Sequence, residues 1–158
     1  MTVVDQRALA DLVQKAKAAP RRRSHLLLHR DQDDQVQRLV ILLGTGTYVR
    51  PHQHSEQWEM LALIRGRADF LLFTEGGELM ERIELGADRV GVVEIPPGQV
   101  HGCVAINDGT AVLEIKPGPY RPNEFMPWAP AEGVPDADRF VAWALAARAG
   151  ALWNWGKF

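Results

Sequence analysis

Residues 46–66 have the sequence GTYVRPHQHSEQWEMLALIRG and carry the strongest chemical signal in the chain. His52 and His54 are two residues apart, so in an extended strand their imidazoles project from the same face. Glu59 comes five residues after His54, and the polar stretch 55–57 breaks the strand, so the next strand can turn Glu59 back toward the histidines. Imidazoles and a carboxylate gathered in this way favour a transition-metal site.

A fourth candidate ligand lies in residues 96–107, which have the sequence PPGQVHGCVAIN. His101 opens a strand after a Pro-Gly turn, which places its ring at the mouth of a barrel, where ligands from another hairpin can meet it. Three histidines and a carboxylate suit zinc, iron, manganese, nickel, copper or cobalt, whereas calcium and magnesium prefer oxygen ligands. We therefore predict one divalent transition metal, with iron, zinc, manganese and nickel as the alternatives. Its predicted ligands are His52, His54, Glu59 and His101.

The region from residue 24 to residue 115 has the periodicity of strands. Short apolar stretches rich in β-branched residues alternate with turn signals such as Gly76-Gly77 and Asn107-Asp108-Gly109. No helix-length segment separates them, which argues against a parallel α/β fold. The pattern predicts an all-β fold of eight or nine strands, either an antiparallel sandwich or a small barrel.

Helices are expected at both ends of this β region. Residues 4–19 have apolar side chains at helical spacing, with Asp5 as the N-cap and Pro20 at the end. Residues 136–149 show a second pattern of this kind, which Gly150 ends.

An extended arm is expected between the β region and the second helix. Residues 117–135 contain six prolines, and proline lacks the N–H that an interior strand needs. The aromatic C-terminal sequence LWNWGKF, residues 152–158, is expected to cover the body of the protein or a second subunit. The predicted parts of this single domain are an N-terminal helix at 1–20, a barrel at 21–118 and a C-terminal arm and helix at 119–158.

Composition limits the classes of partner. The net charge of -2 gives no strong field that would attract nucleic acid or an anionic membrane. We interpret the one local exception, Arg21-Arg22-Arg23, as a solvated stretch before a strand. No signal-peptide core is present, and no run approaches the roughly 20 apolar residues of a membrane span. We therefore expect a cytoplasmic protein whose partner is a small molecule, with no nucleic-acid or membrane partner.

Strand parity predicts which neighbours of the ligands face the interior. If the two histidines of the first segment point inward, Tyr48 and Arg50 do so as well. The opposite face of the strand that follows them is unusually apolar for a solvated exterior. Its residues are Trp58, Met60, Ala62 and Ile64. We therefore predict a homodimer that packs partly on this strand.

The candidate catalytic residues are His29, Tyr48 and Arg50. An isomerisation needs a general acid or base, for which His29 and Tyr48 are candidates, and Arg50 is a candidate clamp for an anionic substrate. For His29 a structural histidine is an equal alternative, and for Arg50 a solvent-facing role is comparable. Cys103 is expected to be a small buried residue rather than a redox group or a ligand.

Two motifs of this chain resemble those of the cupin superfamily. Gly46, His52, His54, Glu59 and Gly66 match the first cupin motif at every spacing, and Pro96, Gly98 and His101 match the core of the second. Two departures occur in the second motif, where Gly91 is one residue closer to Pro96 than usual and Ala105 replaces a frequent asparagine.

Over roughly residues 20 to 133, the chain is similar to the WbuC-type cupin-fold metalloproteins. The stretches that carry this resemblance are Val36–Leu39, Tyr48–His52, Pro96–Gly98, Lys116–Tyr120 and Trp128–Pro130. The resemblance implies a jelly-roll barrel with a metal, and an association with bacterial surface-polysaccharide gene clusters.

Three functional hypotheses follow from the predicted site. The first is a metal-dependent isomerase or oxygenase that acts on a sugar derivative or a carboxylated metabolite. The second is a non-catalytic module that binds or senses a small molecule through the metal. The third is a scaffold protein in which the metal is chiefly structural.

Overall fold

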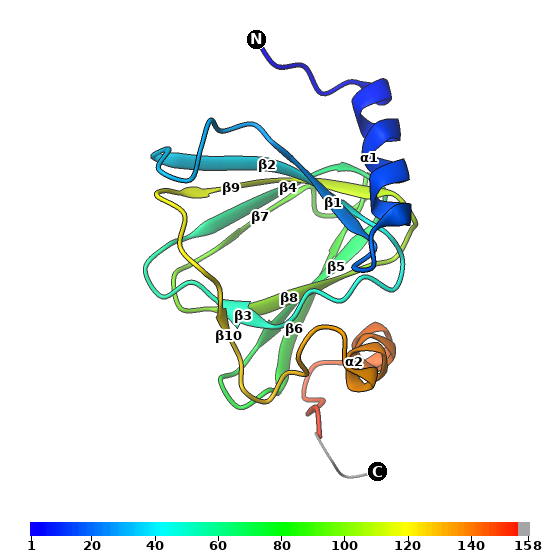
Figure 1. Ribbon diagram of the computed structural model, residues 1–158. Coiled ribbons are helices and arrows are strands. Elements are labelled where there is room, and N and C mark those ends of the chain that lie inside the picture. The colour runs from blue at the N-terminus through cyan, green and yellow to red at the C-terminus, as the bar shows by residue number, and fades with distance from the viewer. Residues whose placement is uncertain (155–158) are drawn as a thin grey trace.

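The computed structural model describes residues 1–154 of the 158-residue chain (Figure 1). In chain order the elements are α1 (Gln6–Ala18), β1 (Arg23–Leu27), β2 (Val36–Leu43), β3 (His52–Gln53), β4 (Glu59–Arg65), β5 (Ala68–Phe73), β6 (Leu79–Leu85), β7 (Val92–Ile95), β8 (Val100–Ala105), β9 (Thr110–Pro117), β10 (Glu124–Phe125) and α2 (Pro135–Ala146).

Two five-stranded antiparallel sheets face each other across the interior of a barrel (Figure 1). The first sheet has the strand order β1-β2-β9-β4-β7, and the second has the order β10-β3-β8-β5-β6. Most neighbours in each sheet are distant in sequence, as in the pairing of β2 with β9 and of β5 with β8. The predicted antiparallel barrel is confirmed.

Strand β4 shows how the sequence pattern sorts side chains between the interior and the exterior. Glu59 and Leu61 are buried on the inner face, whereas Met60 and Ala62 are half-buried and Ile64 is exposed on the outer face. This alternation follows the period of two of a strand with one covered face, as predicted.

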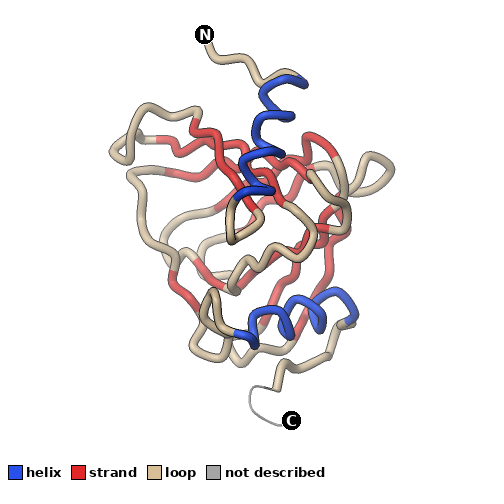
Figure 2. Tube along the Cα trace, turned by 45° about the vertical axis from the view of Figure 1, so that its right-hand side comes forward, coloured by secondary structure: helices blue, strands red, loops and turns tan. Residues whose placement is uncertain are grey.

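The two helices cover opposite sides of the barrel (Figure 2). Helix α1 places Leu9, Leu12 and Ala16 against Val40 and Leu42, on the outer face of the first sheet. It begins at the predicted cap, since the Asp5 carboxylate accepts a hydrogen bond from the Ala8 N–H at 2.9 Å. None of the helices within residues 1–154 is long and apolar enough to cross a membrane.

Helix α2 covers the second sheet and makes β8 a fully buried strand. Phe140 and Ala144 of the helix share one core cluster with Val100 and Val104 of β8. Alternate residues of β8, such as Cys103, pack into the barrel interior instead. Both faces of β8 are therefore covered, which explains why its burial pattern shows no alternation.

The proline-rich arm joins the second sheet as an edge strand. Its short strand β10 pairs with β3, with Glu124 opposite Gln53 and Phe125 opposite His52. An edge position is compatible with the surrounding prolines. The sequence predicted an extended arm here but not this strand. Beyond α2, Trp153 packs against rings of the helix and so covers the body, with its ring centroid 5.2 Å from that of Phe140. Residues 155–158 of the aromatic terminus lie outside the described part of the chain.

Candidate metal centre

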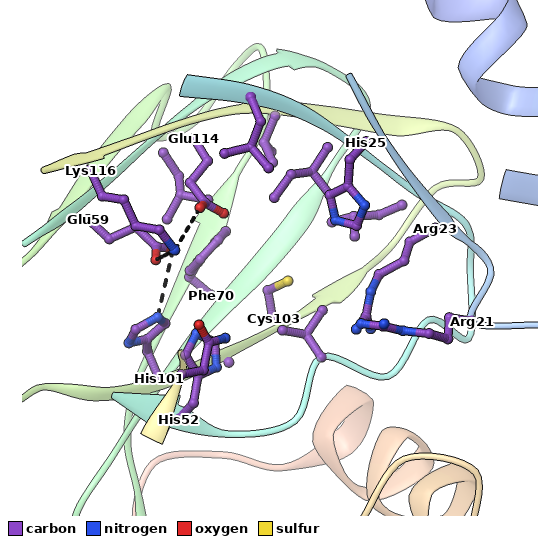
Figure 3. A pocket seen from close by; sticks show the side chains of 18 residues that line it. Arg21, Arg23, His25, His52, Glu59, Phe70, His101, Cys103, Glu114 and Lys116 are labelled. Atoms are coloured by element: carbon purple, nitrogen blue, oxygen red, sulfur yellow. Dashed lines mark ion pairs between the residues drawn. The ribbon is translucent and has the colours of Figure 1, made fainter. Parts of the chain in front are cut away.

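Four ligand-type side chains from three strands and one loop converge inside the barrel. His52 lies in β3, His54 directly follows that strand, Glu59 opens β4 and His101 lies in β8. His52 and His101 face each other in the β3–β8 pairing. All four residues are buried, and one possible ligand atom from each lies within 4.8 Å of the others. Figure 3 shows His52, Glu59 and His101 grouped at one side of a cavity.

Backbone carbonyl groups orient two of the imidazoles. Nδ1 of His52 lies 2.8 Å from the Arg50 carbonyl oxygen, and Nδ1 of His101 lies 2.9 Å from the Gln99 carbonyl oxygen. A carbonyl oxygen can only accept, so each Nδ1 carries the proton and donates it. The lone pair of each neutral ring is therefore on Nε2, the arrangement found when an outer carbonyl fixes a metal-binding histidine.

Two buried imidazole nitrogens that lack a hydrogen-bond partner in the described part of the chain, called orphaned here, bear on whether these residues fit a metal ion. His101 Nε2 and His54 Nδ1 are buried and have no hydrogen-bond partner among residues 1–154. Leaving such a buried polar atom unpaired costs about 1–3 kcal/mol, which coordination of Nε2 would remove. Ligand atoms about 2.0–2.2 Å from a zinc-like ion lie at most about 4.4 Å from one another. The four possible ligand atoms already lie within 4.8 Å of one another, so they need to approach only slightly to bind one ion. The three nitrogens and one oxygen fit a divalent transition metal.

The protonation states of the cluster also suit metal coordination. Burial, together with the neighbouring His101, lowers the pKa of His52 to about 3, and burial likewise lowers the pKa of His101. Burial alone would raise the pKa of Glu59, but the hydrogen bond from His54 at 2.8 Å and nearby positive charge hold it at about 2. At neutral pH His52 and His101 are therefore neutral imidazoles and Glu59 is an ionised carboxylate, the forms that bind metals.

A second buried polar pair, Glu114 and Lys116, lies beside the cluster. Lys116 Nζ is 3.0 Å from Glu114 Oε1 and 3.8 Å from Glu59 Oε2. Burial, reinforced by the charge of Glu59, raises the pKa of Glu114 to about 7. Burial alone would lower the pKa of Lys116, but the two carboxylates raise it above its ordinary value.

The sequence contained a signal for this pair that our prediction did not use. In the segment AVLEIK the alternation of β9 places Val112, Glu114 and Lys116 on one face, and Val112 belongs to the interior core cluster. Charged residues in phase with a core valine indicate an interior polar site.

A cavity of about 210 Å³ adjoins the cluster and runs through the barrel (Figure 3). His52, Glu59 and His101 line one part of it together with the Glu114–Lys116 pair. Arg21, Arg23 and His25 lie on the other side. The sequence interpretation of the three arginines as merely solvated needs correction for Arg23, because β1 begins at this residue and carries its side chain to the cavity. Arg21, in the turn before β1, also lines the cavity but stays largely exposed.

A family described as "Domain of unknown function (DUF6016)" matches residues 4–85, just over half of the chain. The chain belongs to DUF6016. The matched region contains His52, His54 and Glu59 and ends before His101. No curated protein matches the DUF6016 chain.

Several solved structures are similar to the DUF6016 chain at low sequence identity. The DMSP lyase DddQ from Ruegeria pomeroyi DSS-3 has a TM-score of 0.54 and 19% identity, over 70% of this chain and 54% of DddQ. KdgF from Halomonas sp. has a TM-score of 0.51 and 18% identity, over 65% of this chain and 84% of KdgF. The polyketide cyclase RemF from Streptomyces resistomycificus has a TM-score of 0.50 and 20% identity, over 65% of this chain and 70% of RemF.

These likenesses concern the fold. The DUF6016 chain has a two-sheet jelly-roll barrel with a helix at each end, the fold that the motif resemblance predicted.

The three candidate catalytic residues of the DUF6016 chain lie away from the cavity lining. Tyr48 donates a hydrogen bond to the Pro130 carbonyl at 2.8 Å and packs on Phe140, in the core under α2. Arg50 lies over the Phe125 ring at 5.1 Å. His29 accepts a hydrogen bond from the Arg38 N–H at 2.9 Å.

The physical reason for this difference is that residues 47–51 do not form a strand. Parity counted back from His52 therefore does not carry to Tyr48 and Arg50, and the expected inward orientation of these two side chains needs correction. Cys103 does reach the cavity, where burial raises the pKa of its thiol to about 12. A thiol that stays protonated matches the expected small buried residue.

Proposed function

We propose that this protein binds one divalent transition metal through His52, His54, Glu59 and His101 and transforms a small molecule in the adjoining cavity. The observation that carries the proposal is the convergence of four buried ligand atoms, one an orphaned His101 Nε2, at the wall of an open cavity. A bound ion of this kind would act as a Lewis acid that polarises an oxygen of the substrate.

The Glu114–Lys116 pair supports an enzyme rather than a purely structural site. An oxygen-bearing group brought to the ligand cluster would also meet the Lys116 ammonium, which can donate hydrogen bonds to developing negative charge. Glu114 has a pKa near neutrality and lines the same cavity, so it can take or return a proton. We therefore favour proton-transfer chemistry of the isomerase type over the oxygenase type.

The position of the cavity argues against a metal with a chiefly structural role. His52, Glu59 and His101 all line it, so one side of the cluster is left for a water or a substrate. Four protein ligands would close a tetrahedral structural zinc site, but they leave one or two positions open in a five- or six-coordinate ion, as a catalytic metal requires. We also place the chain with the WbuC-type cupins, supported by the shared stretch Lys116–Tyr120, which supplies the cavity lysine.

Metal analysis tests the proposed ligands. Protein purified without a chelating resin should contain about one equivalent of metal, and His101→Ala and Glu59→Gln should each remove most of it. His25→Ala is the matched control, because His25 lines the cavity at the opposite side and should leave the metal content unchanged. Thermal unfolding would establish that the variants are folded. Unchanged metal content in both ligand variants would refute the site.

We further propose a homodimer that packs on the outer face of β4. Supporting this, Ile64 is exposed and Met60 and Ala62 are half-buried on this face, and Val92 of the neighbouring β7 is exposed as well. Light scattering at micromolar concentration should give twice the chain mass, and Ile64→Glu should shift the protein toward the monomer. A wild-type monomer under these conditions would exclude the dimer.

A further inference from the structure

The cavity has three chemically different parts. At one side are the proposed metal ligands together with Glu114 and Lys116 (Figure 3). At the other side are Arg21, Arg23 and His25. The remaining lining is mostly apolar and consists of Leu39, Ile41, Leu43, Val49, Leu61, Phe70, Val112, Gly102, Cys103 and Asn123. A ligand that fills the cavity therefore needs polar groups at its two ends and an apolar portion between them.

The apolar part discriminates between sugars and hydrocarbon chains. A sugar derivative has a hydroxyl on most of its carbons, and each hydroxyl that loses water without gaining a partner costs about 1–3 kcal/mol. Leu61 and Phe70 are fully covered by the barrel and offer no hydrogen-bonding group to such hydroxyls. A methylene chain or an aromatic ring, in contrast, gains free energy from contact with these walls.

The arginine side carries a net positive charge in a fixed geometry. Arg23 donates hydrogen bonds to the Tyr48 carbonyl at 2.5 Å and to Glu132 at 2.6 Å, and Arg21 pairs with the same Glu132 carboxylate at 2.9 Å. Two guanidinium groups thus share one carboxylate. A guanidinium has five N–H donors, so among the described residues Arg23 retains donors for a further acceptor.

Burial makes Arg23 the principal anchor of this side. Its side chain is only 10% exposed, compared with 58% for Arg21. A partly desolvated guanidinium with free donors binds a carboxylate more strongly than a solvated one, and its planar geometry suits two parallel hydrogen bonds.

Resting on the proposed metal site, we infer that the substrate is an apolar carboxylate, not a sugar, whose reacting group lies at the ligand cluster and whose carboxylate pairs with Arg23 and Arg21. The apolar walls hold the chain between these two ends. The small size of the cavity, below the roughly 300–1,000 Å³ of drug-sized sites, limits the ligand to a small metabolite.

Three probes of equal length test the two halves of this assignment. Adipic acid monohydroxamate has a metal-chelating head, four methylene groups and a terminal carboxylate. The second probe is the same molecule with a terminal carboxamide in place of the carboxylate, which removes the charge. The third, glucaric acid monohydroxamate, keeps the charge but has a hydroxyl on each middle carbon. Binding of each to zinc-loaded protein would be measured by calorimetry, with pimelic and suberic homologues to match the length of the cavity.

The adipic probe should bind about ten- to a hundredfold more tightly than its carboxamide, the range expected for charged hydrogen bonds. It should also bind more tightly than the glucaric probe. Arg23→Met and the more exposed Arg21→Met should each reduce the preference for the carboxylate, whereas Arg139→Met, on the surface of α2, should leave it unchanged.

Each alternative result has a definite reading. Equal binding of the carboxylate and the carboxamide would refute the pairing of the substrate carboxylate with Arg23 and Arg21. A preference for the carboxylate that is unaltered in both arginine variants would refute it as well. Equal or tighter binding of the glucaric probe would overturn the apolar character. Binding of none of the probes to protein that holds its zinc would overturn the inference and leave the metal site standing, whereas failure to take up zinc would defeat the proposed function itself.

Discussion

The Glu114 carboxyl should make the metal-free protein lose stability as the pH rises. Its pKa is raised from 4.5 to about 7, so the folded state holds a proton that the unfolded state releases. A group of this kind stabilises the fold fully below pH 4.5, and that contribution is lost as the pH rises through about 7. One pKa unit corresponds to about 1.4 kcal/mol, so the whole contribution is on the order of 3 kcal/mol, most of which is lost between pH 5 and pH 8.

The variant Glu114→Gln isolates this contribution because the amide keeps the shape of the side chain and does not titrate. Urea unfolding of chelator-treated protein at several pH values would give the free energy of unfolding of wild type and variant. The wild-type value should fall by roughly 2–3 kcal/mol relative to the variant between pH 5 and pH 8. Lys116 stays protonated in this range, so its own titration adds nothing to the difference between wild type and variant.

Glu94→Gln provides the matched control, because Glu94 is an exposed glutamate on β7. Its stability profile should run parallel to that of the wild type. Parallel profiles for Glu114→Gln and wild type would refute the argument, because they would mean that the Glu114 carboxyl has the same proton affinity in the folded and unfolded states.

Two further substitutions should destabilise the barrel for different reasons. Gly66→Ala places a Cβ 2.6 Å from Thr110 Oγ1 at a residue with φ of +85°. It should lower the free energy of unfolding in urea by at least about 2 kcal/mol. In the control Gly91→Ala the new Cβ meets open space, so the free energy of unfolding should change little. Arg82→Met removes the largely buried ion pair with Asp69 and a hydrogen bond to the carbonyl of Ala147, the C-cap of α2, and should cost about 3–5 kcal/mol. The exposed Arg139→Met should cost about 0.5 kcal/mol or less, and similar losses in the two variants would contradict the reasoning.

The sequence predicted the architecture well because its periodicities are local and unambiguous. The expected helices at 4–19 and 136–149 are found at Gln6–Ala18 and Pro135–Ala146, and the strand-like region forms the barrel. The short strand β10 was not predicted, since two residues within a proline-rich arm carry no periodic signal. Pairing with β3, a tertiary effect, creates it.

The candidate ligands could be found from sequence because motif spacing brought together residues that are far apart in the chain. The cavity walls were harder to predict. Tyr48 and Arg50 were placed by parity, which fails where residues 47–51 leave the strand conformation. Lys116 could have been found from its alternation with Val112 on β9, but Arg23 needed knowledge of which strand edges meet, and this is a property of the sheet order rather than of any local pattern.

The strand order also bears on how the polypeptide acquires its shape during synthesis. Before residue 100 has been made, three of the strand pairings found within residues 1–154 are available, namely β1–β2, β4–β7 and β5–β6. The others wait for β8, β9 and β10, so the nascent chain exposes unpaired strand edges until then. Such non-local pairing folds in milliseconds to seconds and leaves intermediates prone to aggregation. The ligand cluster is therefore completed after the ribosome has delivered β8, and a growing chain that already carries His52, His54 and Glu59 would meet metal ions with an incomplete set of donors.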